Sequence, residues 1–113
     1  MSIASDIIRE HTDTIILSSL MEKDSYGYEI NKKIKQASGG RYELNEATLY
    51  TAFKRLEDSG IDSYWGTERT SARRRYYRIT NFGIETCQRL LEEWKTAKKI
   101  IDTLIEREDG ADE

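Results

Sequence analysis

The chain of 113 residues carries 18 lysines and arginines against 21 aspartates and glutamates, which gives a formal net charge of −3. This length is typical of one domain with one hydrophobic core, while the single cysteine excludes an internal disulfide and favours a reducing environment. The chain has no apolar run of about 18 residues and no signal-peptide pattern at its acidic N-terminus, so we expect a cytoplasmic protein without a membrane span.

The first predicted element is a helix from Ser5 to Met21. Its isoleucines and leucines form an apolar surface wider than one neighbouring element needs, so we expect it either to lie in the middle of the core or to pack against two partners at once. His11, the only histidine of the chain, lies in this helix. Because no set of metal ligands accompanies it, a surface or interface position is the favoured interpretation, and we expect no metal and no cofactor.

A second helix is predicted from a cap at Asp24 or Ser25 to about Ser38, where the pair Gly39 and Gly40 ends it. Its predicted buried stripe is Tyr26, Ile30, Ile34 and Ala37. A brief extended link over residues 41–44 leads into a third helix. Two helices joined by a short connection have the anatomy of a helix-turn-helix.

The third helix is predicted from Asn45, a good N-cap, to Gly60, which we expect to end the helix with a positive φ. Its buried stripe follows helical spacing and consists of Leu49, Ala52, Phe53 and Leu56. The opposite face is small, hydroxylic and aromatic, with a cation one turn later, and consists of Ala47, Thr48, Tyr50, Thr51 and Lys54. Such a face fits a DNA major groove. The alternative is an ordinary solvated helix face.

After residue 60 the apolar pattern changes to period 2, which predicts a β-hairpin with strands Ile61–Trp65 and Arg75–Ile79. Between residues 66 and 78 the chain has five arginines against one glutamate. Three of them, Arg73, Arg74 and Arg75, are consecutive and repel one another. This favours a hairpin tip that lies along a nucleic-acid backbone or in a minor groove. The alternative is an arginine-rich loop that serves solubility.

The last predicted helix begins after a cap at Thr80 and runs from Asn81 to about Arg107. Apolar residues recur at spacings of three and four, which is typical of a seam between helices. Residues 1–80 are too few to cover a helix of nearly 40 Å, so its far half should pack against a second chain. Cys87 lies on the buried stripe and is predicted to be a packed thiol rather than a redox sensor.

The predicted organisation therefore has three parts. Residues 1–80 form a DNA-binding domain, residues 81–108 a dimerisation helix, and residues 109–113 a disordered acidic tail. The fold class is mainly α with a β-hairpin, a winged helix-turn-helix with a long C-terminal dimerisation helix. We expect the dimer interface at Ile8, Leu90, Leu91, Trp94, Ile101 and Leu104.

The motifs, taken together, resemble the PadR family of transcriptional repressors. The matching runs are Tyr26-Gly27-Tyr28-Glu29-Ile30, Ala47-Thr48-Leu49-Tyr50, Lys54-Arg55-Leu56-Glu57 with Gly60, and Arg75-Tyr76-Tyr77-Arg78-Ile79-Thr80 with Gly83. They occur in the family's order and spacing over nearly the whole chain. The single C-terminal helix looks like the smaller PadR subfamily, and the stretches 43–51 and 63–66 are most similar to its multidrug-sensing members.

The resemblance implies a winged helix, a homodimer made by the first and last helices, and repression that a ligand relieves. It also implies that flat aromatic drugs bind between paired tryptophans at the dimer centre, where Trp94 matches the family's tryptophan. The other matching pore positions are Ile7, Glu10, Thr14 and Lys98. Glu10 stands in place of a small residue, and Lys98 reverses the charge of an acidic position.

We therefore expect a dimeric repressor that binds a palindromic site in double-stranded DNA and is released by a planar aromatic effector. The expected DNA contacts are Asn45, Ala47, Thr48, Tyr50, Thr51, Lys54, Arg73, Arg74 and Arg75. One alternative is a winged-helix module that binds protein, and another is a PadR-type repressor without a small-molecule effector. An enzyme is not expected, because one histidine, one cysteine and no clustered carboxylates form no catalytic constellation.

Overall fold

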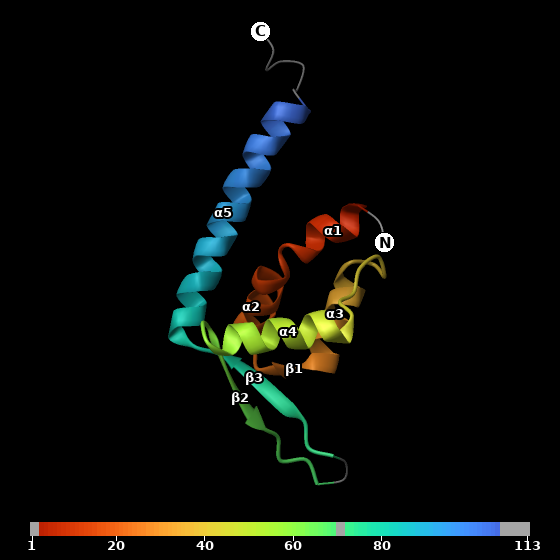
Figure 1. Cartoon of the computed structure of the whole chain (residues 1–113), viewed down its shortest axis with the longest axis vertical. Coiled ribbons are helices and arrows are strands. Elements are labelled where there is room, and N and C mark those ends of the chain that lie inside the picture. The colour runs from red at the N-terminus through yellow and green to blue at the C-terminus, as the bar shows by residue number, and fades with distance from the viewer. Residues whose placement is uncertain (1–2, 70–71, 107–113) are drawn as a thin grey trace.

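The computed structural model describes residues 3–69 and 72–106, and its architecture is a winged helix with a long C-terminal helix (Figure 1). This confirms the predicted fold class. The elements follow in the order α1 (Ile3–Arg9), α2 (Thr12–Glu22), β1 (Ser25–Tyr26), α3 (Gly27–Ala37), α4 (Glu46–Glu57), β2 (Ile61–Trp65), β3 (Arg75–Ile79) and α5 (Asn81–Ile105). The predicted acidic tail, residues 109–113, lies outside the described residues.

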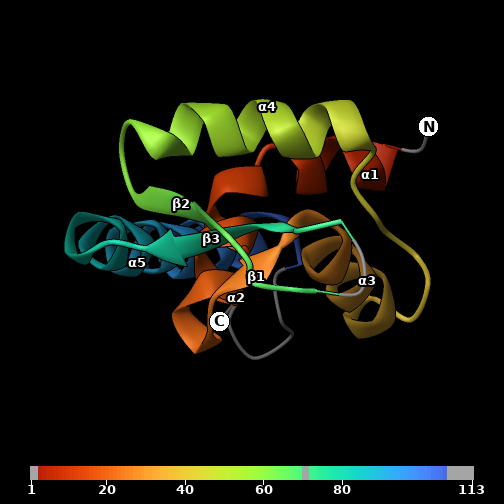
Figure 2. The same ribbon diagram turned by 90° about the horizontal axis from the view of Figure 1, so that it is seen from below.

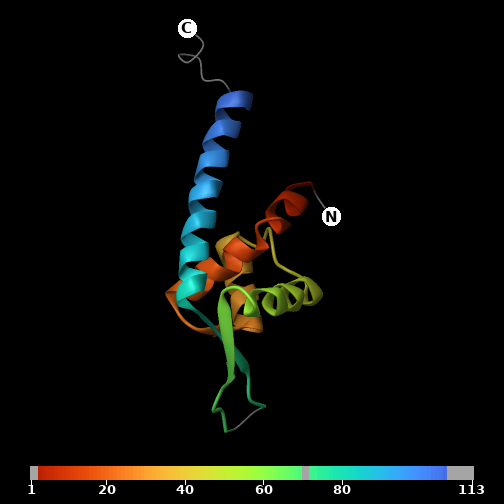
Figure 3. The same ribbon diagram turned by 60° about the vertical axis from the view of Figure 1, so that its left-hand side comes forward.

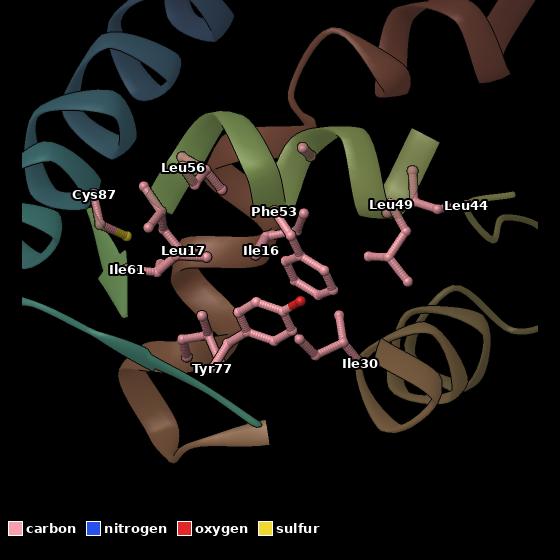
Figure 4. Close-up of a cluster of buried hydrophobic side chains, with 12 residues drawn as sticks. Ile16, Leu17, Ile30, Leu44, Leu49, Phe53, Leu56, Ile61, Tyr77 and Cys87 are labelled. Atoms are coloured by element: carbon pink, nitrogen blue, oxygen red, sulfur yellow. The ribbon is translucent and has the colours of Figure 1, made fainter. Parts of the chain in front are cut away.

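The core lies between α2, α3, α4, the first turns of α5 and one face of the sheet (Figure 4). At its centre the rings of Phe53 and Tyr77 stack with centroids 3.9 Å apart, so α4 is joined directly to β3. The fully buried side chains include the predicted stripe of α4, namely Leu49, Ala52, Phe53 and Leu56. Burial of this stripe directs the opposite face of α4 outward.

The first helix is not continuous, contrary to the prediction. It breaks at residues 10–11 into α1 and α2, and the His11 N–H donates to the Ile8 carbonyl at 2.9 Å in a tighter turn. The Thr12 hydroxyl donates to the Arg9 carbonyl at 2.5 Å, so a side chain takes the place of a helical backbone donor. The break explains the wide apolar surface, since α2 is in the core whereas Ile7 of α1 is exposed.

The second helix begins later than predicted. The N-cap position is held by Tyr26 and not by the predicted Asp24 or Ser25. Ser25 and Tyr26 form β1, which pairs antiparallel with β3 and makes the sheet three-stranded in the order β1-β3-β2. This long-range pairing is not visible in local sequence. α3 therefore starts at Gly27 without a side-chain cap, and the predicted stripe is buried at Ile30 but exposed at Ala37.

Two predicted helix caps, Asn45 and Thr80, are confirmed, and the predicted helix stop at Gly60 is not. Asn45 caps α4 by accepting the Thr48 N–H at 2.8 Å, and Thr80 caps α5 by accepting the Gly83 N–H at 3.0 Å, as predicted. The prediction for Gly60 was wrong, because the positive-φ glycines among the described residues are Gly39 and Gly40. A Cβ on Gly60 would lie 3.1 Å from the Cα of Gly83, so it is close packing that requires a glycine there.

Helix α5 leaves the domain after about half its length and extends away from it, while the hairpin extends in the opposite direction (Figures 1 and 3). The protein consequently measures 65 × 31 × 20 Å. Cys87 is completely buried against the core, but Trp94, Ile101 and Leu104 are 39%, 48% and 68% exposed. Among the described helices, none is long and apolar enough to span a membrane.

Candidate nucleic-acid interface and aromatic groove

The outward face of α4 is exposed along its full length, and no other described element covers its outer side (Figure 2). Ala47, Thr51 and Lys54 are spaced by four and three residues, so they form one exposed row on this face. Asn45, at the start of the row, has its side-chain oxygen engaged in the helix cap. The row is narrow and carries only small, hydroxyl and cationic groups.

Two predicted residues flank this row on opposite sides. Tyr50 leans toward α3: its ring contacts Phe53 edge-on at 5.5 Å, and it remains half exposed. A Cβ built on Gly27 would lie 2.6 Å from the Tyr50 hydroxyl, so the glycine of α3 makes room for this tyrosine. Thr48 lies on the other side and faces the turn between α1 and α2.

The hairpin of β2 and β3 forms the wing, residues 61–79, with Trp65 opposite Arg75 at the outer end of the paired strands. One carboxylate, Glu68, closes the loop of the wing. It accepts the Tyr76 hydroxyl at 2.7 Å and the Arg74 backbone N–H at 3.2 Å. The hydrogen bond from Tyr76 is the main cause that lowers the pKa of Glu68, and the same bond raises the pKa of Tyr76.

The three consecutive arginines are exposed and have different neighbours. Arg75 donates to Ser63 at 2.8 Å and to Glu57 of α4 at 3.4 Å, so it joins the wing to α4. The Arg74 guanidinium is 3.6 Å from Glu68. Arg73, Arg74 and Arg75 also lie over aromatic rings, a feature that the sequence analysis did not predict.

A second feature is an apolar groove between α1, α2 and α5, which we call the aromatic groove. Its volume is about 400 Å³, and it is lined by Ile7, Ile8, His11, Thr14, Ile15, Ser18, Leu91 and Trp94. The rings of His11 and Trp94 meet edge-on at 4.7 Å. Three predicted effector positions, Ile7, Thr14 and Trp94, therefore lie together, and His11 joins them through its contact with Trp94.

Two other predicted effector positions are not in the lining of this groove. Glu10 lines a separate hollow of about 410 Å³ between the α1–α2 turn and α4, together with Thr48 and Thr51. Beneath that hollow Asp13 pairs with Arg55, and this hydrogen bond is the main cause that raises the pKa of Arg55. Lys98 is exposed on α5, one turn beyond Trp94.

Comparison with known proteins identifies the family. Residues 16–89 match the Transcriptional regulator PadR-like family, which is well over half of the chain. The chain belongs to the PadR-like family of transcriptional regulators. Because this family consists of transcriptional regulators, the prediction that the chain is not an enzyme is confirmed.

This PadR-like chain is similar to several solved structures. A transcriptional regulator from Clostridium thermocellum is 50% identical, with a TM-score of 0.83 over 92% of this chain and 99% of that one. A PadR family transcription regulator from Clostridium difficile is 37% identical, with a TM-score of 0.74 over 84% of this chain and 98% of that one. Bacillus subtilis PadR, solved in complex with operator DNA, is 22% identical with a TM-score of 0.62, over 70% of this chain and 45% of that one; this likeness concerns the fold.

The single cysteine of this PadR-like protein is buried. Burial raises the pKa of the Cys87 thiol, which makes it less reactive and agrees with the predicted packed thiol. Across residues 3–69 and 72–106, no three histidine, cysteine, aspartate or glutamate side chains gather in a way that would hold a metal ion.

Proposed function

We propose that this PadR-like regulator is a dimeric repressor that lays α4 in the major groove of its operator and the wing along the adjoining backbone. The observation that supports this most is the contact of Arg75 with both Glu57 and Ser63, at 3.4 and 2.8 Å. It fixes the cationic wing relative to the exposed row of α4. Contacts to bases and to phosphates are then made by one preorganised unit.

Within this proposal the residues divide by role. The row of Ala47, Thr51 and Lys54, with Tyr50 beside it, faces the base edges, because it is exposed on the side of α4 opposite the buried stripe. Asn45 and Thr48, at the start of α4, lie near the phosphate backbone. The wing cations Arg73, Arg74 and Arg75 supply sequence-independent attraction to phosphates.

The proposed dimer is supported by the exposure of large apolar side chains on α5. Ile101 and Leu104 lie on the part of α5 that extends beyond the domain, and Trp94 is 39% exposed beside the aromatic groove. Exposed apolar surface of this extent marks a partner surface. Together with Ile8, Leu90 and Leu91, these three residues form the proposed seam with a second copy. A two-fold dimer binds a palindrome whose half-sites are about 10 bp apart, or a multiple of that.

The effector part of the proposal rests on the aromatic groove. In a two-fold dimer, two Trp94 rings that face the axis would form a slot for a planar aromatic molecule, with Ile7 and Thr14 as its walls. The described lining of this groove contains no carboxylate. A cationic effector would therefore gain chiefly from the indole faces, with Lys98 opposing it and Glu10 on the far side of the α1–α2 turn.

DNA binding is tested by fluorescence anisotropy on a duplex from the region upstream of the coding sequence, titrated at several salt concentrations. The combined change of Arg73, Arg74 and Arg75 to Ala should weaken binding to every duplex and flatten the salt dependence by about one unit per lost phosphate contact. Lys54→Ala should weaken binding to the operator more than to an unrelated duplex.

Lys95→Ala is the matched control, since it removes one exposed cation of α5 far from α4 and the wing. It should leave both affinity and salt slope as in the wild type. An unchanged slope in the triple arginine variant would remove the wing from the mechanism, and loss of affinity in Lys95→Ala would show that the assay reports net charge only.

Effector binding is tested without DNA by titrating neutral, anionic and cationic planar dyes while following tryptophan fluorescence. Because the chain has two tryptophans, Trp94→Ala leaves Trp65 as the remaining fluorophore. We expect saturable quenching in the wild type that is lost in Trp94→Ala. Equal quenching in both proteins would contradict the role of Trp94, and absence of saturable quenching by all dyes would leave a repressor without this effector.

A further inference from the structure

The three wing arginines share an arrangement that the DNA-binding proposal does not require. The guanidinium carbons of Arg73 and Arg75 lie 5.9 and 5.5 Å from the ring centroid of Trp65, and that of Arg74 lies 4.8 Å from the ring of Tyr26. Alternate residues of an extended chain point to opposite faces. The ring of Trp65 therefore contacts both Arg73 and Arg75, and the ring of Tyr26 contacts Arg74 on the other face.

The two rings are themselves fixed by the sheet. Trp65 is paired with Arg75 in the ladder between β2 and β3, yet it is 53% exposed and contributes little to the core. Tyr26 of β1 meets Tyr76 edge-on at 5.4 Å, and the Tyr76 hydroxyl is held by Glu68. An exposed tryptophan at a strand end and a braced tyrosine thus form two platforms beneath the cationic tip.

A ring platform has a different consequence from a carboxylate partner. A carboxylate accepts the N–H groups of a guanidinium and cancels its charge, whereas a ring contacts the flat face and leaves the N–H edge available. Arg73 has no ion pair among the residues that the structure describes, and its described contact is with Trp65. Arg74 and Arg75 also pair with Glu68 and Glu57, whereas the ring of Trp65 holds Arg73 in place and leaves its charge available.

We propose that Trp65 and Tyr26 are positioning residues that hold the wing arginines ready for the phosphate backbone. Side chains that are already ordered lose less freedom on binding, so the platforms increase affinity without adding a phosphate contact. This inference rests on the proposed DNA-binding function. It assigns to Trp65 a role that differs both from core packing and from direct base contact.

The test compares Trp65→Leu, which removes the platform, with Trp65→Phe, which keeps an aromatic face, on the same labelled duplex and over the same salt series. Trp65→Leu should weaken binding about tenfold, the cost of ordering one or two long side chains on binding, while the salt slope stays that of the wild type because all cations remain. Trp65→Phe should recover most of the loss. Limited trypsin digestion, at equal thermal stability, should cleave the arginine segment faster in Trp65→Leu.

Phe82→Leu is the matched control, because it removes another exposed ring, in the first turn of α5. If Trp65→Leu loses thermal stability, Tyr26→Leu is measured in its place with Tyr26→Phe as its rescue. The inference would be overturned if the leucine variant bound DNA with wild-type affinity. It would also be overturned if the salt dependence of binding flattened as it does when arginines are lost. In both cases the proposed function would stand. A wild-type protein that binds no duplex would overturn both.

Discussion

At the scale of single residues, the contact between Gly60 and Gly83 determines how α5 meets the wing. The two backbones touch, and the Thr80 N–H donates to the Gly60 carbonyl at 2.9 Å just before α5 begins. A side chain on either glycine would separate the helix from the sheet. Both glycines are buried, which agrees with a joint that is packed rather than flexible.

Gly83→Ala should therefore destabilise the protein. The new Cβ would lie 2.9 Å from the Gly60 carbonyl carbon and 2.8 Å from the Ile79 side chain, and the backbone cannot yield. We expect a loss of about 1–3 kcal/mol in the free energy of unfolding, measured by urea denaturation. Gly27→Ala is the matched control, since it also lies in a helix but its Cβ would meet the movable Tyr50 hydroxyl. Equal stability of Gly83→Ala and the wild type would contradict this packing.

At the scale of elements, the wing is the part whose order depends on one ionised side chain. Glu68 joins Tyr76 to the loop, and the Gly66 N–H donates to the Arg74 carbonyl at 2.7 Å within the same turn. The fold lowers the pKa of Glu68 below its ordinary value of 4.5, so the folded wing favours the charged carboxylate. The stabilisation of the folded wing by this carboxylate is present above the ordinary pKa of Glu68 and is lost as the pH falls through the lowered pKa.

The wing should consequently loosen in acid before the core unfolds. Hydrogen exchange at the Gly66 amide, corrected for its intrinsic pH dependence, should show protection that decreases as the pH falls below about 4.5. In Glu68→Gln the protection should be lower at neutral pH and should change little with acidification. If the protection of the Gly66 amide in the wild type did not change down to pH 3, the Glu68 carboxylate would not be what holds the loop of the wing closed.

Much of the element structure could be predicted because its causes are local. The cap at Asn45, the stripe from Leu49 to Leu56, the cap at Thr80 and the period-2 strands are each visible within a few residues. The exposed row of α4 follows from the same stripe, since burial of one face determines which residues face outward. The family resemblance was confirmed, whereas the roles of its site residues remain predictions.

The features that the sequence did not reveal depend on distant partners. The strand at Ser25 forms only because β3 lies beside it, and Gly60 is required by a residue 23 positions later. At the break before Thr12, the Thr12 hydroxyl donates to the Arg9 carbonyl, a local bond that apolar periodicity does not detect. Glu10, next to the break, lines the hollow beside α4, whereas His11 lies in the aromatic groove. The ring platforms of the wing likewise require strand register.

At the scale of the whole molecule, the long last helix extends beyond the domain that it joins (Figure 1). α5 extends from the domain with Ile101 and Leu104 about half to two thirds exposed, and the aromatic groove opens beside its middle. Among the residues that the structure describes, no other element covers the far half of that helix. A second copy, packed through α1 and α5, is the partner that we propose.

Ile101→Glu should convert the protein to a monomer, because it would place an unpaired charge in the seam. Sedimentation velocity at micromolar concentration should give the dimer for the wild type and the monomer for this variant, with an unchanged circular dichroism spectrum. Thr103→Glu adds the same charge on the opposite face of α5 and should remain dimeric. A wild-type protein that sediments as a monomer would contradict the dimer.

Hydroxyl-radical footprinting of the upstream region tests the central claim most directly, that a symmetric dimer reads DNA with α4 and the wing. The account predicts two equivalent protected patches related by a two-fold axis, with centres about 10 bp apart or a multiple of that. Replacing Arg73, Arg74 and Arg75 with Ala should abolish the outer part of each patch, and Ile101→Glu should abolish both patches. A single asymmetric patch, or no protection at protein concentrations that saturate binding, would contradict the account.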